Sequence, residues 1–126
     1  MGGRRCEAVD VIEVERTNTV LYCEPWAEVV GFYRDRLGLT IVFENDWFVE
    51  FAISQGAYLS VADPARATVA PSDGRGVTLS WKVGDVVAAR EALVRAGVEV
   101  GEIRFRFGSP VVDLHDPVGN RIELWS

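Results

Sequence analysis

The chain carries the same order of structural signals twice, and this repeat constrains its fold more than any other feature. Each copy begins with a strand-like segment, continues with an amphipathic helix that ends at a glycine, and closes with three short strand-like segments. When the copies are aligned on those glycines, Gly38 matches Gly97 and Leu39 matches Val98. Such a repeat indicates one supersecondary unit used twice. Two sheets that each carry a helix on one face leave their other faces free to form a cleft for a small ligand.

The first copy begins with a β-branched and aromatic segment, residues 18–24, which predicts a strand. An additional N-terminal strand is expected over residues 11–15, where apolar and acidic residues alternate. Pro25 is suited to the start of a helix over residues 26–37, whose apolar residues recur at intervals of three and four. Gly38 is expected to end that helix in a left-handed conformation. Three further strands are predicted at residues 40–43, 47–53 and 57–62.

The second copy follows a segment without hydrophobic periodicity, residues 63–76, which is rich in Ala, Pro, Ser, Asp and Gly. This composition predicts a linker or mobile loop. Strict alternation of apolar and polar residues over residues 77–83 then predicts a strand. Asp85 is expected to cap a helix that runs to about Ala96 and ends at Gly97. Three more strands are predicted at residues 98–104, 109–115 and 121–125.

The chain of residues 1–126 is expected to form one α+β domain, with module one at about 18–62 and module two at about 77–125. Hydrophobic residues make up 48% of the sequence, which is sufficient for a core. The net charge of −6 disfavours binding to phosphate backbones and anionic lipid, so neither nucleic acid nor a membrane is an expected partner.

The sequence also predicts a cytoplasmic location. No apolar stretch approaches the roughly 20 residues of a membrane span, and no signal-peptide core follows the early arginines. The two cysteines, Cys6 and Cys23, make neither a disulfide framework nor a zinc quartet. Cys23 alternates with apolar neighbours and is expected to be a small buried hydrophobe.

Three motifs in the two copies resemble those of a known superfamily. Residues 26–39 hold a Phe-Tyr pair followed by Leu-Gly, residues 83–98 run from Val-Gly-Asp-Val to Ala-Gly-Val, and residues 116–124 contain Asp-Pro-Val-Gly-Asn and then Glu. In this order and spacing the chain resembles the vicinal oxygen chelate superfamily of glyoxalase I, bleomycin-resistance proteins and extradiol dioxygenases. The resemblance covers most of the chain. It implies two β-α-β-β-β modules that form a curved, mixed sheet lined by a cleft.

The resemblance also implies four positions for the ligands of one divalent metal, which acts as a Lewis acid in the enzymes of this superfamily. The first strands of the two modules place these positions at Asn18 or Thr19 and at Thr78, and the last strands place them at Ser60 and Glu123. Only Glu123 is a good ligand, because Zn²⁺, Ni²⁺ and Fe²⁺ prefer imidazole, thiolate and carboxylate groups. No metal and no other cofactor is therefore expected.

The chain has a single histidine, His115, which immediately precedes the Asp-Pro turn. A site of two histidines and one carboxylate cannot come from one chain with one histidine. A dimer supplies two copies of His115, but only a suitable symmetry would bring them to one site. His115 is interpreted as a partly exposed residue at a strand end, and its role is left open.

Strand alternation predicts which side chains face the cleft. Asp113 and Glu123 are expected there together, and two interpretations of them remain open. Repulsion between the two carboxylates raises one pKa and creates a general acid or base; alternatively, Lys82 or Arg121 neutralises one carboxylate in an ion pair. The side chains predicted to bind a ligand in this cleft are Trp125, Trp47, Tyr22, Tyr58, Thr78, Ser80, Lys82 and Asn18.

The favoured function is metal-free binding of an aromatic or drug-like small molecule, because aromatic side chains in a groove stack on flat ligands. This resembles the drug-sequestering, antibiotic-resistance branch of the superfamily. A homodimer is expected, since the sheets leave edges that need covering. An alternative is a lyase, an isomerase or epimerase, or a dioxygenase-type enzyme, with catalytic Glu123 and Asp113 or an unusual metal site. A third is a dimeric interaction or regulatory domain with a vestigial cleft.

Overall fold

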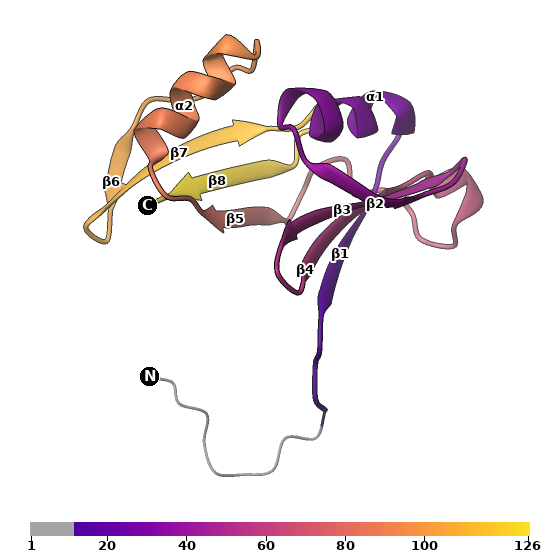
Figure 1. The fold of residues 1–126 in the computed structure, drawn as a ribbon. Helices are drawn as coiled ribbons and strands as arrows, with labels where there is room; N and C mark the ends of the chain where they lie inside the picture. The colour runs from indigo at the N-terminus through magenta and orange to yellow at the C-terminus, as the bar shows by residue number, and fades with distance from the viewer. Residues whose placement is uncertain (1–11) are drawn as a thin grey trace.

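A computed structural model describes residues 12–126 and shows two four-stranded mixed sheets (Figure 1). The strand orders are β1-β4-β3-β2 in the first sheet and β5-β8-β7-β6 in the second. In each sheet the first strand runs parallel to the last strand of its module, and the other pairs are antiparallel. The same topology therefore occurs twice, which confirms the two predicted β-α-β-β-β modules and the α+β class.

The helices and strands occur in the predicted order. Module one consists of β1 (Thr17–Tyr22), α1 (Trp26–Gly31) continued by a π-helical turn (Phe32–Arg36), β2 (Thr40–Glu44), β3 (Phe48–Ser54) and β4 (Ala57–Ala62). A short 3-10 turn (Pro64–Arg66) lies in the linker. Module two consists of β5 (Thr78–Lys82), α2 (Val86–Arg95), β6 (Arg104–Arg106), β7 (Ser109–His115) and β8 (Arg121–Trp125).

Two predicted strands are wrong. Residues 12–15, with Ile12 and Val14 exposed, form no strand, and Val11 lies outside the described residues. The predicted strand at 98–104 is also absent, since only its last residue enters β6. The apolar residues of that segment pack against the core from an irregular path, so their pattern reports burial rather than strand pairing.

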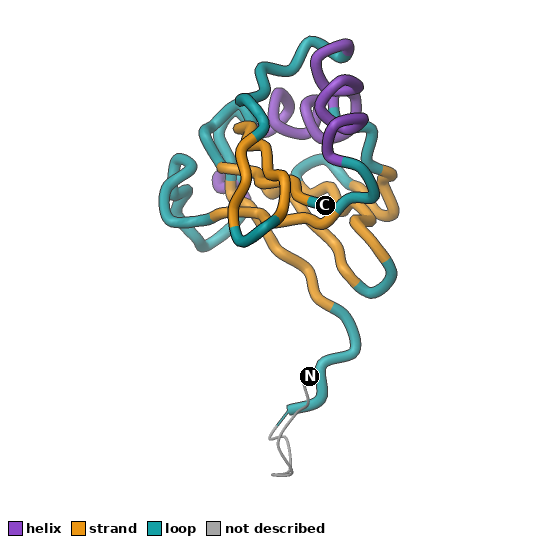
Figure 2. Tube along the Cα trace, turned by 90° about the vertical axis from the view of Figure 1, so that its left-hand side faces the viewer, coloured by secondary structure: helices purple, strands orange, loops and turns teal. Residues whose placement is uncertain are grey.

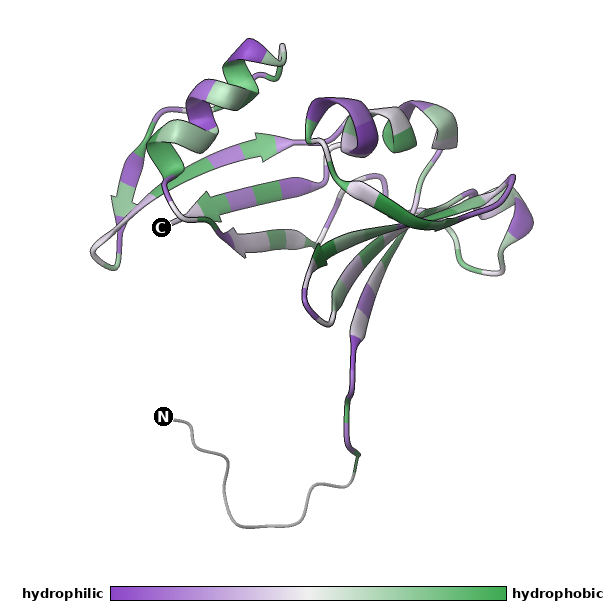
Figure 3. Cartoon of the chain, in the orientation of Figure 1, coloured by the Kyte–Doolittle hydropathy of each residue, from purple (hydrophilic) through white to green (hydrophobic). Residues whose placement is uncertain are grey.

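The two helices cover the same side of both sheets (Figures 1 and 2). Apolar and polar residues alternate along β8 (Figure 3), so its Ile122 and Leu124 lie on one buried face. The apolar faces pack under the helices, and the buried core includes Val29, Val30, Tyr33, Phe51, Leu59 and Val61 in module one and Val86, Leu93, Val112, Leu114 and Ile122 in module two. The opposite faces, which carry both polar and aromatic side chains, lie on the side without helices. Among the described residues, no helix is both long and apolar enough to cross a membrane.

A buried carboxylate joins the two modules. The hydroxyl of Tyr33, in the π-helical turn after α1, donates a hydrogen bond of 2.7 Å to Asp116 Oδ2 in the turn before β8. Asp116 also accepts bonds from the Asn120 side chain (2.8 Å), the Asn120 amide (2.8 Å) and the Val118 amide (3.1 Å). Burial and the nearby Asp116 charge raise the pKa of Tyr33, and the same two causes raise the pKa of Cys23 to about 12.

Candidate functional site

The uncovered face of the second sheet carries the candidate site. On this face the strand pairing places cationic, carboxylate, hydroxyl and aromatic side chains beside one another. Cross-strand neighbours on one face of a sheet have Cβ atoms about 4.5–5.5 Å apart, so they contact directly. The pairing gives three rows from β5 through β8 to β7: Lys82–Trp125–Val111, Ser80–Glu123–Asp113 and Thr78–Arg121–His115.

A hollow of about 430 Å³ lies on this face, beside the β6–β7 hairpin. Trp125 is half-buried on β8, Val111 is buried beside it on β7, and Phe107 is fully exposed at the hairpin tip. Phe107 has a positive φ of 52°, which a hairpin loop of this kind requires. The side chains that line the hollow are Ser80, Arg106, Phe107, Ser109, Val111, Glu123 and Trp125.

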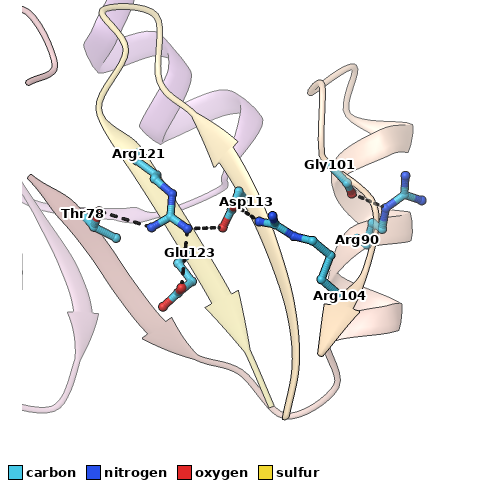
Figure 4. A network of polar contacts seen from close by, with 7 residues as sticks. All are labelled: Thr78, Arg90, Gly101, Arg104, Asp113, Arg121 and Glu123. Atoms are coloured by element: carbon cyan, nitrogen blue, oxygen red, sulfur yellow. Dashed lines mark hydrogen bonds and ion pairs between the residues drawn. The ribbon is translucent and has the colours of Figure 1, made fainter. Parts of the chain in front are cut away.

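An ion-pair network crosses the sheet next to this hollow (Figure 4). Asp113 accepts a hydrogen bond of 2.9 Å from Arg121 and pairs on its other oxygen with Arg104. Arg121 also lies 3.6 Å from Glu123 Oε2, so its guanidinium stands between the two carboxylates. Lys82 takes no part, because its Nζ lies over the Trp125 ring, 5.5 Å from the centroid. The geometry is therefore that of carboxylates neutralised by arginine, with Arg121 rather than Lys82 as the shared partner.

The residues at the four metal-ligand positions do not fit a divalent ion. In module one, Asn18 rather than Thr19 lies on the uncovered face of the sheet, and its Oδ1 accepts a hydrogen bond of 2.8 Å from Ser60. In module two, Arg121 donates a bond of 3.3 Å to Thr78, so a fixed positive charge lies beside that position. Within residues 12–126, no group of three His, Cys, Asp or Glu side chains could hold a metal ion.

Glu123, the one carboxylate among the four positions, is itself engaged. Its Oε1 accepts a hydrogen bond of 2.8 Å from the Ser80 hydroxyl, and its Oε2 lies against Arg121. A metal at Glu123 would have to bind beside a guanidinium that lies 3.6 Å from this carboxylate. The donor chemistry and the local charge both argue against a metal at this place.

Other predicted ligand-binding residues lie outside the 430 Å³ hollow. Tyr58, on the first sheet, lies beneath Arg16, whose guanidinium carbon is 3.7 Å from the ring centroid. Tyr22 borders a separate hollow of about 260 Å³ next to the linker. Trp47 packs edge-on against Phe48, with ring centroids 5.5 Å apart. The structure thus brings Ser80, Glu123 and Trp125 together but distributes the remaining aromatics elsewhere.

His115 is exposed at the end of β7 and borders a third hollow, of about 530 Å³, together with residues of α1 and of the turn after α2. It contributes no side chain to the hollow at Trp125.

The sequence reasoning missed the residues of β6 and its hairpin. Arg104 pairs with Asp113, while Arg106 and Phe107 line the hollow. Their signal is the alternation Arg-Phe-Arg-Phe directly before Gly108, which is typical of a strand that enters a tight turn. The sequence predicts this strand six residues too early, at 98–104. The side chains of Arg106 and Phe107 are therefore assigned to no face of the sheet.

Solved structures share this fold at low sequence identity. A lactoylglutathione lyase from Agrobacterium tumefaciens superposes with a TM-score of 0.71 at 21% identity, covering 97% of this chain and 95% of that one. TnmS3, an antibiotic-binding protein from Streptomyces sp. CB03234, superposes with a TM-score of 0.69 at 20% identity, covering 93% and 97%. A glyoxalase/bleomycin resistance protein from Catenulispora acidiphila gives 0.70 at 18%, covering 87% and 96%.

At these identities the structural likeness shows the fold alone. No protein of curated function matches the chain in sequence. The family model described as Glyoxalase/Bleomycin resistance protein/Dioxygenase superfamily matches residues 17–124, which span both modules from the first strand to the last. The chain therefore belongs to the Glyoxalase/Bleomycin resistance protein/Dioxygenase superfamily.

Proposed function

We propose that this chain is a metal-free binding protein for flat, aromatic small molecules. The observation that carries the proposal is the 430 Å³ hollow built around Trp125, on a sheet face whose ligand positions do not suit a metal.

The size and lining of the hollow support a small-molecule ligand. Its volume falls in the range of roughly 300–1,000 Å³ that is usual for ligand sites. Trp125, Val111 and Phe107 supply apolar and aromatic contact surface, and Ser80 and Glu123 supply polar atoms at one side. Apolar walls with a few placed polar groups are the usual composition of such sites.

Membership of the superfamily supports the same class of ligand. One structural neighbour, TnmS3, is an antibiotic-binding protein. We propose an antibiotic as the ligand by analogy, and stacking on Trp125 would favour a flat aromatic one, so that the chain would confer resistance by sequestration.

The enzyme alternative receives less support from the site. A general acid or base needs a carboxylate that is free to exchange a proton with the substrate. Asp113 contacts two arginines, and Glu123 contacts Arg121 and Ser80. The proposed role of both carboxylates is to hold the arginines in place on the binding face.

The test compares Trp125→Ala with Trp47→Ala, since both indoles are partly buried but only Trp125 lines the hollow. Calorimetric titration with a panel of fused-ring aromatics should show binding by the parent chain. Loss of stacking at roughly 0.5–1.5 kcal/mol, together with the lost contact area, should weaken binding to Trp125→Ala by about tenfold or more. Trp47→Ala should bind within about twofold of the parent.

Unchanged affinity in Trp125→Ala would refute the proposed site. Elemental analysis tests the metal-free part separately. One tightly held equivalent of a transition metal, lost in Glu123→Ala, would overturn it.

A further inference from the structure

We infer that the ligand of this site is anionic: a flat aromatic compound that carries a carboxylate, sulfonate, phosphate or acidic phenol. The inference rests on the proposed function and deepens it by naming the charge of the ligand. It follows from the local charge of the second sheet, whose sign is opposite to that of the whole chain.

The chain has a net charge of −6, yet cations predominate on the uncovered face of the second sheet. Pairing of β6 with β7 puts Arg104 beside Val111 and Arg106 beside Ser109, on the same face as the hollow. The charged lysine, arginine and carboxylate side chains of this face are Lys82, Arg104, Arg106, Arg121, Asp113 and Glu123.

Both carboxylates of this face already have cationic neighbours. Asp113 holds Arg104 and Arg121, and Glu123 holds Arg121 and a hydroxyl. Asp113 is therefore compensated by two arginines, and Glu123, which also lines the hollow, by the Arg121 guanidinium at 3.6 Å and the Ser80 hydroxyl. A cation placed here would also face the remaining positive charges, which disfavours it.

Two cations remain available to an anion. Lys82 and Arg106 have no carboxylate within 4.0 Å in the part of the chain that the structure describes, residues 12–126. Lys82 stands over Trp125, and Arg106 lines the same hollow from β6. A flat ring system on Trp125 thus has an available cation on each side of it.

The position of these cations suits an aromatic anion in particular. Pairing across the four strands gives the row Lys82–Trp125–Val111–Arg104, and Arg106 lies two residues from Arg104 on the same face of β6, where it lines the hollow. At a strand spacing of about 4.8 Å, the row spans about 14 Å, which leaves room for fused rings between its ends. Opposing charge from the first sheet is limited, because Glu50 on its uncovered face is paired with Arg16.

The experiment uses three ligands that share one ring system: anthracene-2-carboxylate, anthracene-2-carboxamide and 2-(aminomethyl)anthracene. Their affinities for the full chain are measured by calorimetry or by anthracene fluorescence at low salt. The carboxylate should bind about tenfold or more tightly than the carboxamide, and the ammonium compound should bind most weakly. This preference should shrink as salt is added.

Variants identify the groups responsible. Lys82→Gln and Arg106→Gln should each weaken carboxylate binding about three- to tenfold and carboxamide binding by less than about twofold, since the lost contact is shared but the lost charge is not. The matched control is Arg95→Gln, which removes an exposed cation in the last turn of α2, on the side of the helices. It should leave all three affinities unchanged. All substitutions replace exposed side chains, and thermal melts check that each variant folds.

The outcomes separate this inference from the proposed function. If all three ligands bind equally and Trp125→Ala weakens each of them, the site stands and the anionic preference is refuted. A carboxylate preference that persists in both the Lys82 and Arg106 variants also refutes it. If none of the three ligands binds the parent chain, the proposed function and the inference fail together.

Discussion

At the scale of single residues, the hydrogen bond from Tyr33 to Asp116 explains why two distant sequence motifs have the composition they do. The partners are 83 positions apart, and both side chains are buried. An uncompensated buried carboxylate is strongly destabilising, so Asp116 needs every donor that surrounds it. The Phe-Tyr pair of one motif and the Asp-Pro-Val-Gly-Asn turn of the other thus form a single structural unit that fixes one module against the other.

Replacing Tyr33 with Phe should therefore destabilise the chain while leaving its core volume nearly unchanged. The substitution removes one donor to a buried charged acceptor, and such bonds contribute roughly 1.5–3 kcal/mol. Urea unfolding should show a loss of free energy of unfolding in that range. Tyr58→Phe is the control, because Tyr58 lies on the uncovered face beneath Arg16, and it should change stability by less than about 0.5 kcal/mol. Equal effects in the two variants would contradict this account of Asp116.

Cys23 should be unreactive toward thiol reagents in the folded protein. It is 2% exposed, as expected of a small buried hydrophobe, and burial beside Asp116 raises its pKa to about 12. In a Cys6→Ser background, where Cys23 is the remaining thiol, a thiolate-selective reagent at pH 8 should label the unfolded chain quickly and the folded chain very slowly. Rapid stoichiometric labelling of the folded chain would show that the thiol is accessible.

The same pKa shift predicts the direction of an alkaline effect on stability. Between the ordinary thiol pKa of 9.0 and about 12, the unfolded chain loses the Cys23 proton while the folded chain keeps it. The unfolded state then binds fewer protons, so stability falls as pH rises through this window. Cys23→Ala should show a shallower decline, measured as the free energy of unfolding at pH 8, 9 and 10. An identical slope in the variant would rule out this source of alkaline destabilisation.

At the scale of elements, local signals were reliable where they coincided with turn chemistry. β4, β7 and β8 have the predicted bounds, because alternating strands are delimited by Gly, Pro, Asn and Asp residues. Asp85 caps α2 as predicted and accepts bonds from the amides of Val87 (3.0 Å) and Ala88 (3.3 Å). β6 was missed because the apolar residues between α2 and β6 follow an irregular path over the core. Burial without strand pairing produces a pattern that sequence alone cannot distinguish from a strand.

The candidate site was predictable where it depends on correctly placed strands, and not where it depends on β6. Side chains alternate between the two faces of a strand, and this alternation alone places Ser80 of β5 and Glu123 and Trp125 of β8 on one face. Neutralisation of one carboxylate by Lys82 or Arg121 is one of the two interpretations that the sequence leaves open. That Arg121 rather than Lys82 does this, and that it reaches both carboxylates, depends on side-chain reach across strands, which the pattern does not contain. The contribution of Arg106 and Phe107 depends on the position of β6, so the error in that strand removed them from the predicted site.

In the linker after β4, Gly74 lies so close to the turn before β8 that no side chain fits there. A Cβ at Gly74 would lie 2.5 Å from the Val118 carbonyl oxygen and 2.5 Å from the Gly119 carbonyl carbon, and φ at Gly74 is +80°. Gly76 has a similar φ of +83°, but nothing lies within 4 Å of its Cβ position. Comparing these two glycines therefore separates steric overlap from the backbone preference alone.

Gly76→Ala should lower the free energy of unfolding by about 1–2 kcal/mol, the cost of a left-handed conformation for a residue with a Cβ. Gly74→Ala should lose about 1–3 kcal/mol more, because backbone atoms of the turn before β8 must move. Both values come from urea or thermal unfolding. Similar losses in the two variants would show that the linker does not pack against that turn in solution.

At the scale of the whole molecule, the largest surface without a covering element is the helix-free side of the two sheets, together with the sheet edges. Phe43 on the edge strand β2 and Phe105 on the edge strand β6 are 52% and 75% exposed. Unpaired edges with exposed apolar side chains favour association with other chains. A second copy is the simplest cover, since most homo-oligomers are symmetric dimers. We therefore expect a homodimer, and light scattering after size exclusion at tens of micromolar should give twice the mass of the chain; a monomer would contradict this.

The dimer also bears on Trp125, since an indole on an uncovered sheet face suits either a ligand or a partner chain. The two roles predict different results for Trp125→Ala. If Trp125 is the ligand platform, the variant should dimerise with an affinity within about twofold of the parent and melt at nearly the same temperature, while losing ligand binding. If Trp125 anchors the interface, sedimentation across a dilution series should show dissociation at higher protein concentration than for the parent. We expect the first result, because Trp125 borders a hollow with an available cation on either side, an arrangement suited to a small charged ligand. Dissociation of the variant, with ligand affinity retained by its remaining dimer, would assign Trp125 to the interface instead.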